Sequence, residues 1–257
     1  MAKLQKKTVA FQRLRTLPSI ISSQPGLGRG LWKAWVIFKE VWLYDIQRPG
    51  VTTGFVSRSD YHTLSSAFMW YSPSETRTSR DIIDFCGEWF TSYFTYSKSD
   101  VVPVFVDFGA GAAKPNIQAI ESRKFAVSIA FELDDTLLAQ AASNFQAMAK
   151  RSGDFKAAVA FKGDVASKGS IEKLREKILE TVGDKSFVLC AYNKNSYGPE
   201  TLREAIALLD QVFGSYVYMY QKPVHRRVLE EAGLVFHRLV LDPKLRKNRD
   251  WLLAART

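Results

Sequence analysis

The chain has few of the residues that build metal centres or disulfide frameworks. Its 257 residues include two cysteines, Cys86 and Cys190, and three histidines. The cysteines lie far apart in the sequence and match no metal or disulfide spacing, and the histidines are too scattered to form a cluster. We therefore expect no catalytic metal and a reducing, cytoplasmic environment.

Long hydrophobic runs are also missing from the sequence. No apolar run reaches the ~18 residues that a membrane-spanning helix requires, so we expect a soluble chain. Hydrophobic residues nevertheless make up 46% of the sequence. That share is sufficient for a full core and argues against a disordered chain.

Acidic residues are missing from the N-terminal segment. Residues 1–39 contain no aspartate or glutamate, whereas they carry eight lysines and arginines. A second basic run lies at residues 244–249, and the remainder of the chain is nearly balanced. The net charge of +10 therefore indicates a basic arm for an anionic surface, such as a membrane or RNA, rather than a basic cleft.

Residues 1–43 are expected to form a basic amphipathic helical segment in two pieces, because Pro18 and Gly26–Gly28 interrupt the pattern. The second piece, Leu31–Leu43, predicts an amphipathic helix that docks on the body through its aromatic residues. Three interpretations of the first piece stay open: a targeting presequence, a helix on an anionic membrane, or a basic helix packed on its own domain.

Residues 44–100 are expected to form a cap or lid followed by a helix. Residues 44–75 are rich in serine, threonine, tyrosine and glycine and show weak periodicity, which is typical of lids and binding loops. Asp81–Tyr93 has apolar residues at helical spacing. It therefore predicts a helix directly before the core.

Residues 101–257 show alternating strand and helix signals. Such alternation predicts an α/β fold with a mostly parallel sheet and helices on both faces. The last two strands follow one another without a helix, so we expect them to form a hairpin. The expected strands are 104–106, 125–131, 157–161, 187–192, 216–220, 234–241 and 251–255. The expected helices are 115–122, a helix ending near 150, 170–182, 200–213 and 224–232.

Polar residues and glycines follow four of these strands, at the edge where ligands bind in such sheets. Asp107, Gly109 and Gly111 follow the first strand, and the glycines allow a sharp turn and a close approach to a ligand. Glu132 follows the second strand, where a carboxylate can accept the two hydroxyls of a ribose. Asp164, after the third strand, is placed to bind an adenine amine or the loop near it. Residues 193–198, after the fourth strand, face the space for a reacting group.

The glycine spacing distinguishes two cofactor classes. A dinucleotide motif needs a small residue three positions after the second glycine, so that the helix can pack on the strand. Lys114 occupies that position, and a long cation there argues against a nicotinamide cofactor. The spacing fits better a loop that holds an amino-acid moiety together with adenosine.

Residues 107–113 resemble the first motif of class I S-adenosylmethionine-dependent methyltransferases, acid-x-Gly-x-Gly-x-Gly, with Ala113 in place of the third glycine. The resemblance covers about residues 102–257. It implies a three-layer, Rossmann-like sheet of seven strands with an antiparallel last strand, and S-adenosyl-L-methionine as cofactor. Glu132 matches the family's ribose-binding acid, Asp164 its adenine-side acid, and Asn193–Tyr197 the motif after the fourth strand.

The segment before the core carries a second, looser resemblance. Asp45–Gly54 and Tyr71–Ser74 resemble the corresponding segment in a group of small methyltransferases of unassigned substrate. Residues of this region usually contact the cofactor in the family. The resemblance therefore implies that Tyr71 and Ser74 contact S-adenosylmethionine.

The activity that the resemblance implies is in-line transfer of a methyl group to a nucleophilic N, O or C atom. Asn193, with Tyr197 nearby, would orient the acceptor. Residues 193–196 lack the Asn/Asp-Pro-Pro-aromatic form of the amino-methylating nucleic-acid enzymes, which favours a protein side chain or a small molecule as acceptor. Two alternatives stay open: an inactive binding module whose basic arm engages RNA or a membrane, and a nicotinamide-dependent oxidoreductase.

Each candidate residue also has a purely structural interpretation. The two glycines can serve a tight turn alone, and Glu132 can stabilise the start of the next helix. Asp164 can be an ordinary turn residue, and residues 193–196 can be a loop that begins a helix. Tyr71 and Tyr197 can be packed aromatic residues.

Overall fold

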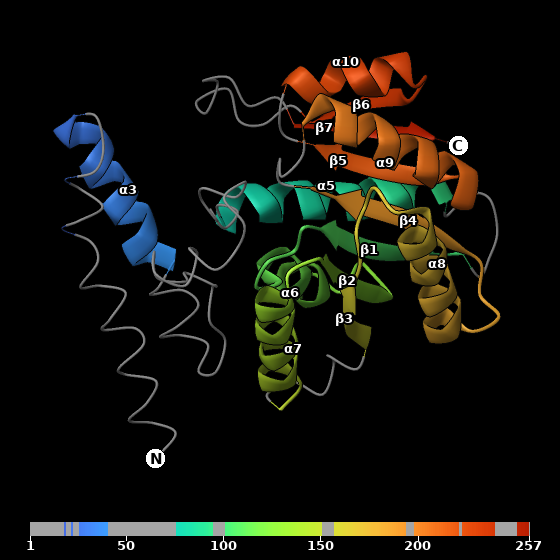
Figure 1. Cartoon of the computed structure of the whole chain (residues 1–257), viewed down its shortest axis with the longest axis horizontal. Coiled ribbons are helices and arrows are strands. Elements are labelled where there is room, and N and C mark those ends of the chain that lie inside the picture. Colours follow the sequence, from blue (N-terminus) through green and yellow to red (C-terminus); the bar gives the residue numbers. More distant parts are fainter. Residues whose placement is uncertain are drawn as a thin grey trace.

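The computed structural model describes residues 18, 22, 26–40, 76–94, 101–150, 157–193, 198–220, 223–239 and 251–256. One sheet of seven strands forms the centre of the molecule (Figure 1). The strands are β1 Val102–Phe108, β2 Val127–Glu132, β3 Ala158–Lys162, β4 Phe187–Tyr192, β5 Tyr216–Tyr220, β6 Val235–Leu239 and β7 Trp251–Arg256.

The sheet order is β3-β2-β1-β4-β5-β7-β6. Strands β1 to β5 pair in parallel, whereas β7 runs antiparallel to both of its neighbours, β5 and β6. The α/β class, the seven strands, the antiparallel last strand and the closing hairpin of β6 and β7 are therefore confirmed. The central strand β1 is buried on both faces, which explains why it is an unbroken apolar run rather than an alternating one.

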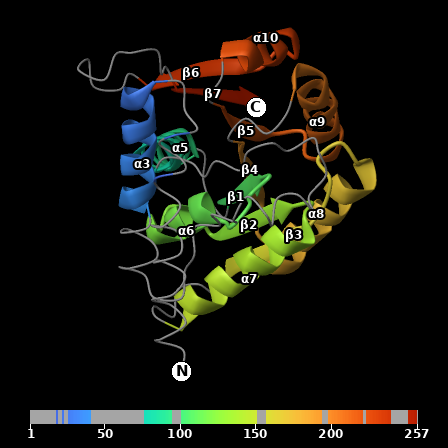
Figure 2. The same cartoon turned by 60° about the vertical axis from the view of Figure 1, so that its left-hand side comes forward.

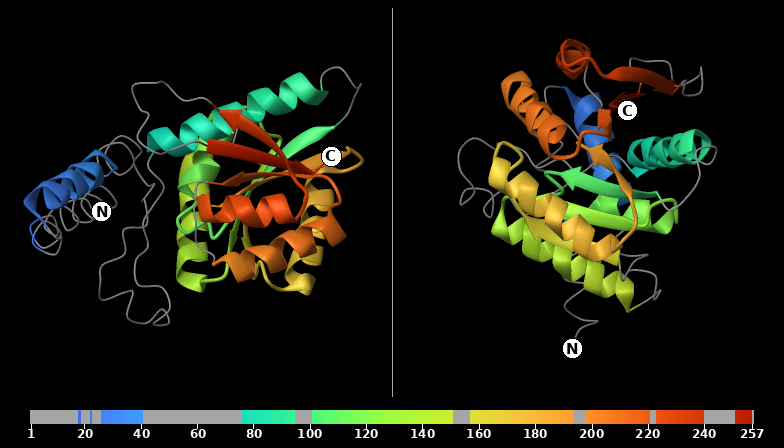
Figure 3. Two further views of the ribbon diagram at one scale, coloured as in Figure 1. Left: turned by 90° about the horizontal axis from the view of Figure 1, so that it is seen from above. Right: turned by 90° about the vertical axis from the view of Figure 1, so that its right-hand side faces the viewer.

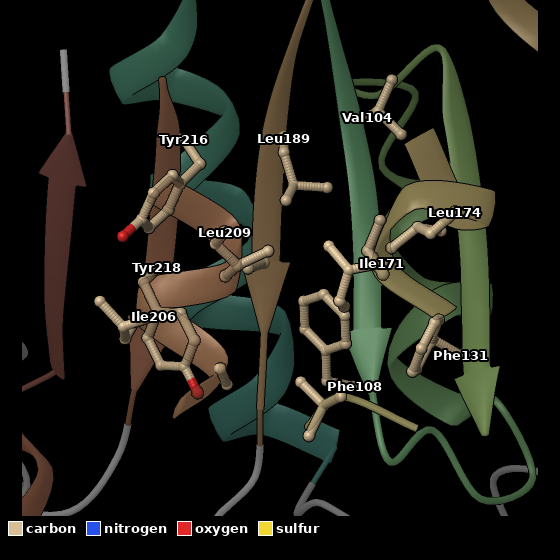
Figure 4. Packing of buried hydrophobic residues seen from close by; sticks show 14 of the residues in the cluster. Val104, Phe108, Phe131, Ile171, Leu174, Leu189, Ile206, Leu209, Tyr216 and Tyr218 are labelled. Carbon is tan, nitrogen blue, oxygen red and sulfur yellow. The ribbon is translucent and has the colours of Figure 1, made fainter. Parts of the chain in front are cut away.

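Helices cover both faces of the sheet, as the right-hand view of Figure 3 shows. Helices α8, α9 and α10 pack on one face, where Val104, Val106 and Phe108 of β1 also point (Figure 4). Helices α5, α6 and α7 pack on the other face, against side chains that include Phe105 and Ala130. The bounds are α5 Thr76–Phe94, α6 Lys114–Glu121, α7 Asp135–Ala149, α8 Lys168–Val182, α9 Pro199–Val212 and α10 Pro223–Glu231.

Helix α3, Leu27–Glu40, lies at one end of the molecule, beyond α5 and away from the sheet (Figures 1 and 2). The prediction that its aromatic residues dock on the body is wrong, because Trp32 and Trp35 are 57% and 60% exposed. Among the side chains of α3 whose burial is described, the buried ones are the small Gly30 and Ala34. Helical periodicity identifies an apolar face, but it does not tell which face of the helix meets the protein.

The three predicted segments, 1–43, 44–100 and 101–257, stay a prediction, since residues 41–75 lie outside the described part. Among the described helices, none combines the length and the apolar character that crossing a membrane demands.

Candidate functional site

The carboxyl ends of β1, β2 and β4 bring three of the predicted site residues to one edge of the sheet. Asp107 is 2% exposed and stands opposite Ala130 of β2 and Tyr192 of β4. Glu132 ends β2, and Asn193 follows β4 directly. The parallel register therefore places these residues at the central strands, where ligands bind in open α/β sheets.

The glycine loop after β1 uses left-handed backbone at three positions. Gly109 and Gly111 have φ angles of 76° and 55°, and Ala113 has 61°. The two glycines adopt this conformation without a Cβ clash, whereas Ala113 does so at a steric cost. Ala113 is the N-cap of α6, so it is part of the turn that leads into the helix.

Hydrogen bonds attach this loop to the end of β2. The N–H groups of Gly109 and Ala110 donate to the carbonyl oxygen of Phe131 over 2.9 and 3.2 Å. The N–H of Gly111 donates to Oε2 of Glu132 over 2.7 Å. The loop and the acid that sequence analysis selected separately are thus in direct contact.

Glu132 is 8% exposed and accepts two further backbone bonds at Oε1, from the N–H groups of Leu133 at 2.9 Å and Asp134 at 3.1 Å. A carboxylate offers about four acceptor positions. Three of them are filled by backbone N–H groups, and the fourth is on Oε2.

Helix α7 holds the same loop from the other side. Nδ2 of Asn144 donates to the carbonyl oxygen of Ala112 over 2.8 Å, and Gln140 donates to Oδ1 of Asn144 over 3.2 Å. Asn144 is fully buried. Sequence analysis missed it, although an amide among the apolar residues that share its side of α7, such as Ala141 and Phe145, was a usable signal.

Lys114 begins α6 and is 1% exposed. It is followed by Pro115, whose missing N–H suits the first helical turn. A buried lysine stands here in place of the small residue that a dinucleotide motif requires. The argument against a nicotinamide cofactor stays a prediction.

Asp164 forms its own turn at the end of β3. Its Oδ1 accepts the N–H of Ala166 at 3.0 Å, and its carbonyl oxygen accepts the N–H of Ser167 at 3.1 Å. The neighbouring residue 163 is a glycine for a steric reason, since a Cβ there would lie 2.3 Å from the ring of Phe131. The half-buried Asp164 thus has a structural role, and a role toward adenine stays a prediction.

Asn193 is 1% exposed and lies near the hydroxyl of Tyr218 on the neighbouring strand β5. Burial raises the pKa of Tyr218, and the nearby Asn193 side chain opposes that shift. Figure 4 shows the Tyr218 hydroxyl pointing toward the same end of the sheet as Phe108. Tyr218 is a second residue that sequence analysis missed, because the sequence of its strand is typical of a buried core strand.

The remaining predicted site residues, Tyr71, Ser74 and Tyr197, lie outside the described residues. Within the described ranges, no group of three or more histidine, cysteine, aspartate or glutamate side chains is arranged to hold a metal ion.

Comparisons with known proteins return solved structures at low sequence identity. No family model matches the chain, and no curated protein matches it. Among solved structures, precorrin-6y C5,15-methyltransferase from Geobacter metallireducens is 17% identical over 81% of this chain and 97% of its own, with a TM-score of 0.43. The METTL16 methyltransferase domain is 13% identical over 72% of this chain and 69% of its own, with a TM-score of 0.48. Magnesium protoporphyrin IX methyltransferase from Synechocystis PCC 6803, with bound S-adenosylmethionine, is 11% identical over 81% and 99%, with a TM-score of 0.43.

Proposed function

We propose that the protein is an S-adenosyl-L-methionine-dependent methyltransferase. The observation that carries the proposal is the contact of the Glu132 carboxylate with the N–H of Gly111, at the carboxyl ends of two adjacent parallel strands. This contact puts a nearly buried anion beside a loop of left-handed backbone. A ribose and the amino-acid end of one cofactor need these two features side by side.

The residues present fit such a cofactor. Asp107 and the loop of Gly109 and Gly111 would hold the methionine end, and Glu132 would accept a ribose hydroxyl at the open position of Oε2. Asp164 would lie on the adenine side. Tyr71 and Ser74 are proposed as further cofactor contacts from the segment before the core.

Asn193 and Tyr197 are proposed to orient the acceptor. Asn193 follows strand β4 directly and lies near the Tyr218 hydroxyl on β5. When bound, the cofactor supplies an electrophilic methyl group, and the protein's task is alignment of the two reactants and exclusion of water. The acceptor's lone pair would take the methyl group as the bond of that group to sulfur breaks, and the acceptor's proton would pass to a base or to water.

We propose a small molecule or a protein side chain as the acceptor, because Lys194 and Asn195 stand where the amino-methylating nucleic-acid enzymes have two prolines. The basic residues 1–39 are proposed to contact an anionic surface. A cytoplasmic location is also proposed, with support from Cys86 and Cys190, which are both buried as free thiols.

The test is calorimetric titration of the purified protein with S-adenosylhomocysteine, S-adenosylmethionine and NADH. We expect saturable binding of the two adenosyl compounds and none of NADH. A tritiated-methyl screen on cell extract then searches for the acceptor. Failure of both adenosyl compounds to bind would refute the proposal, and binding without any methylated product would favour a binding module of the same fold.

A further inference from the structure

Helix α3 presents large apolar side chains to solvent. Leu27 is 70% exposed, Leu31 52%, Trp35 60% and Phe38 38%. At about 100° per residue, these four positions fall within an arc of about 80° on one side of the helix. Trp35 and Phe38 stack on each other with their ring centroids 5.8 Å apart, so they form one continuous surface.

This apolar arc lies beside the buried positions of α3 and is itself exposed. Among the side chains of α3 whose burial is described, the buried ones are Gly30 and Ala34, which lie about 60° and about 20° from Leu27, on the side away from Leu31 and Trp35. The helix also lies at one end of the molecule (Figures 1 and 2). Soluble proteins seldom expose several large apolar side chains together unless the patch binds something.

The charge of the surrounding sequence identifies the kind of partner. Residues 1–39 carry eight basic residues and no acidic one. Basic segments are attracted to the negative surface of membranes that contain acidic lipids. Tryptophan prefers the boundary between lipid and water, and an amphipathic helix with a tryptophan- and leucine-bearing face lies in that boundary.

From this combination we propose that α3 lies on an anionic lipid surface, with Leu27, Leu31, Trp35 and Phe38 inserted among the lipid headgroups and the upper acyl chains. The proposal goes beyond the methyl-transfer function and does not depend on it. RNA fits the same surface less well, since it binds cations and stacked aromatic rings. Leu27 and Leu31 would then stay in water.

The test is co-sedimentation of the full chain with vesicles. Phosphatidylcholine vesicles containing about one third phosphatidylserine are compared with phosphatidylcholine alone, because acidic lipid supplies the surface charge. The double variant Leu31→Gln/Trp35→Gln removes the apolar surface at exposed positions, so the core is not disturbed. The matched control is Leu179→Gln, which changes a 37% exposed leucine on α8.

We expect the wild-type chain and the Leu179→Gln control to bind the phosphatidylserine vesicles, with an affinity that falls as salt is added. The double variant should bind them at least about tenfold more weakly, because each large apolar side chain contributes about that factor or more when it leaves water. Binding of S-adenosylhomocysteine should be the same in all three chains.

Three results would overturn the proposal. The first is no binding to the acidic vesicles, and the second is equal binding by the wild type and the double variant. The third is that the wild type binds neither kind of vesicle but binds RNA or forms a dimer, and that the double variant loses this binding or dimer formation. In that last case the face belongs to RNA or to a second copy of the chain.

Discussion

Replacing Glu132 by glutamine tests the site most directly, because one side chain joins the loop to the proposed cofactor. Its carboxylate accepts three backbone N–H groups, from Gly111, Leu133 and Asp134. A glutamine keeps the size of the side chain but has one acceptor oxygen and one NH2 donor. With its oxygen toward Leu133 and Asp134, it turns the donor toward the N–H of Gly111.

The magnitude follows from that mismatch. A nearly buried N–H that loses its acceptor costs about 1–3 kcal/mol. We therefore expect Glu132→Gln to lower the free energy of unfolding by about 2 kcal/mol. For a chain of this size that corresponds to a fall of about 4–8 °C in Tm. The cofactor should lose a charged hydrogen bond to ribose, worth about 1.5–3 kcal/mol, which weakens binding about tenfold to hundredfold.

The assay is differential scanning calorimetry together with titration of S-adenosylhomocysteine, at a temperature where both proteins are folded. The matched control is Asp135→Asn, three residues away, where an acid that is 76% exposed pairs with Lys162 at 2.7 Å. That variant should change stability by less than about 1 kcal/mol and leave cofactor binding intact. Equal Tm and equal affinity for Glu132→Gln and the wild type would refute the reasoning.

Three further predictions concern the neighbouring structure. Asn144→Ala removes the donor to the Ala112 carbonyl, so it should lower the free energy of unfolding in urea by about 1–3 kcal/mol and weaken the binding of S-adenosylhomocysteine. Gln140→Ala, at a less buried position, should cost less, and equal effects of the two variants would contradict this. Gly163→Ala drives a Cβ to 2.3 Å from the Phe131 ring and should destabilise by about 1–3 kcal/mol, while Gly169→Ala, with open space around it in α8, should be neutral or stabilising. Burial, and then the hydrogen bond to Asp210, raises the pKa of Tyr216, so the folded state retains a proton that the unfolded state releases. The stabilisation from Tyr216 is complete below the unfolded pKa of about 10 and is lost as the pH rises above it. Between about pH 10 and 11, calorimetry should therefore show a Tm that falls less steeply with pH for Tyr216→Phe than for the wild type.

Most of the sheet was predictable because its strands are short apolar runs separated by amphipathic helices, and this pattern is local in sequence. The predicted strand 104–106 extends to Val102–Phe108, because β1 pairs with β4 from Val102 to Asp107 and with β2 from Val104 to Phe108. The site edge was predictable for the same reason, since the carboxyl ends of parallel strands meet. Glu132 and Gly111 were selected as separate strand-end residues, and the structure brings them into contact.

The contacts that were missed join residues distant in sequence. Asn144 reaches a carbonyl 32 residues earlier, and Tyr218 meets Asn193 across neighbouring strands. Neither pairing leaves a local signature. The local sequence pattern could not predict the orientation of α3 either, because Trp35 has the same apolar character whether it packs on the protein or faces outward.

The hydrogen bonds of the glycine loop imply that this part of the site is formed before a ligand arrives. The loop is attached to β2 through the Phe131 carbonyl and Glu132, and to α7 through Asn144. A ligand that meets such a loop does not have to order it, so the entropic cost of binding at this point is small. Glu132 has one open acceptor position on Oε2, and a ribose has two adjacent hydroxyls. Acceptance of both hydroxyls therefore requires that one of the three N–H groups, of Gly111, Leu133 or Asp134, gives up its bond to the carboxylate.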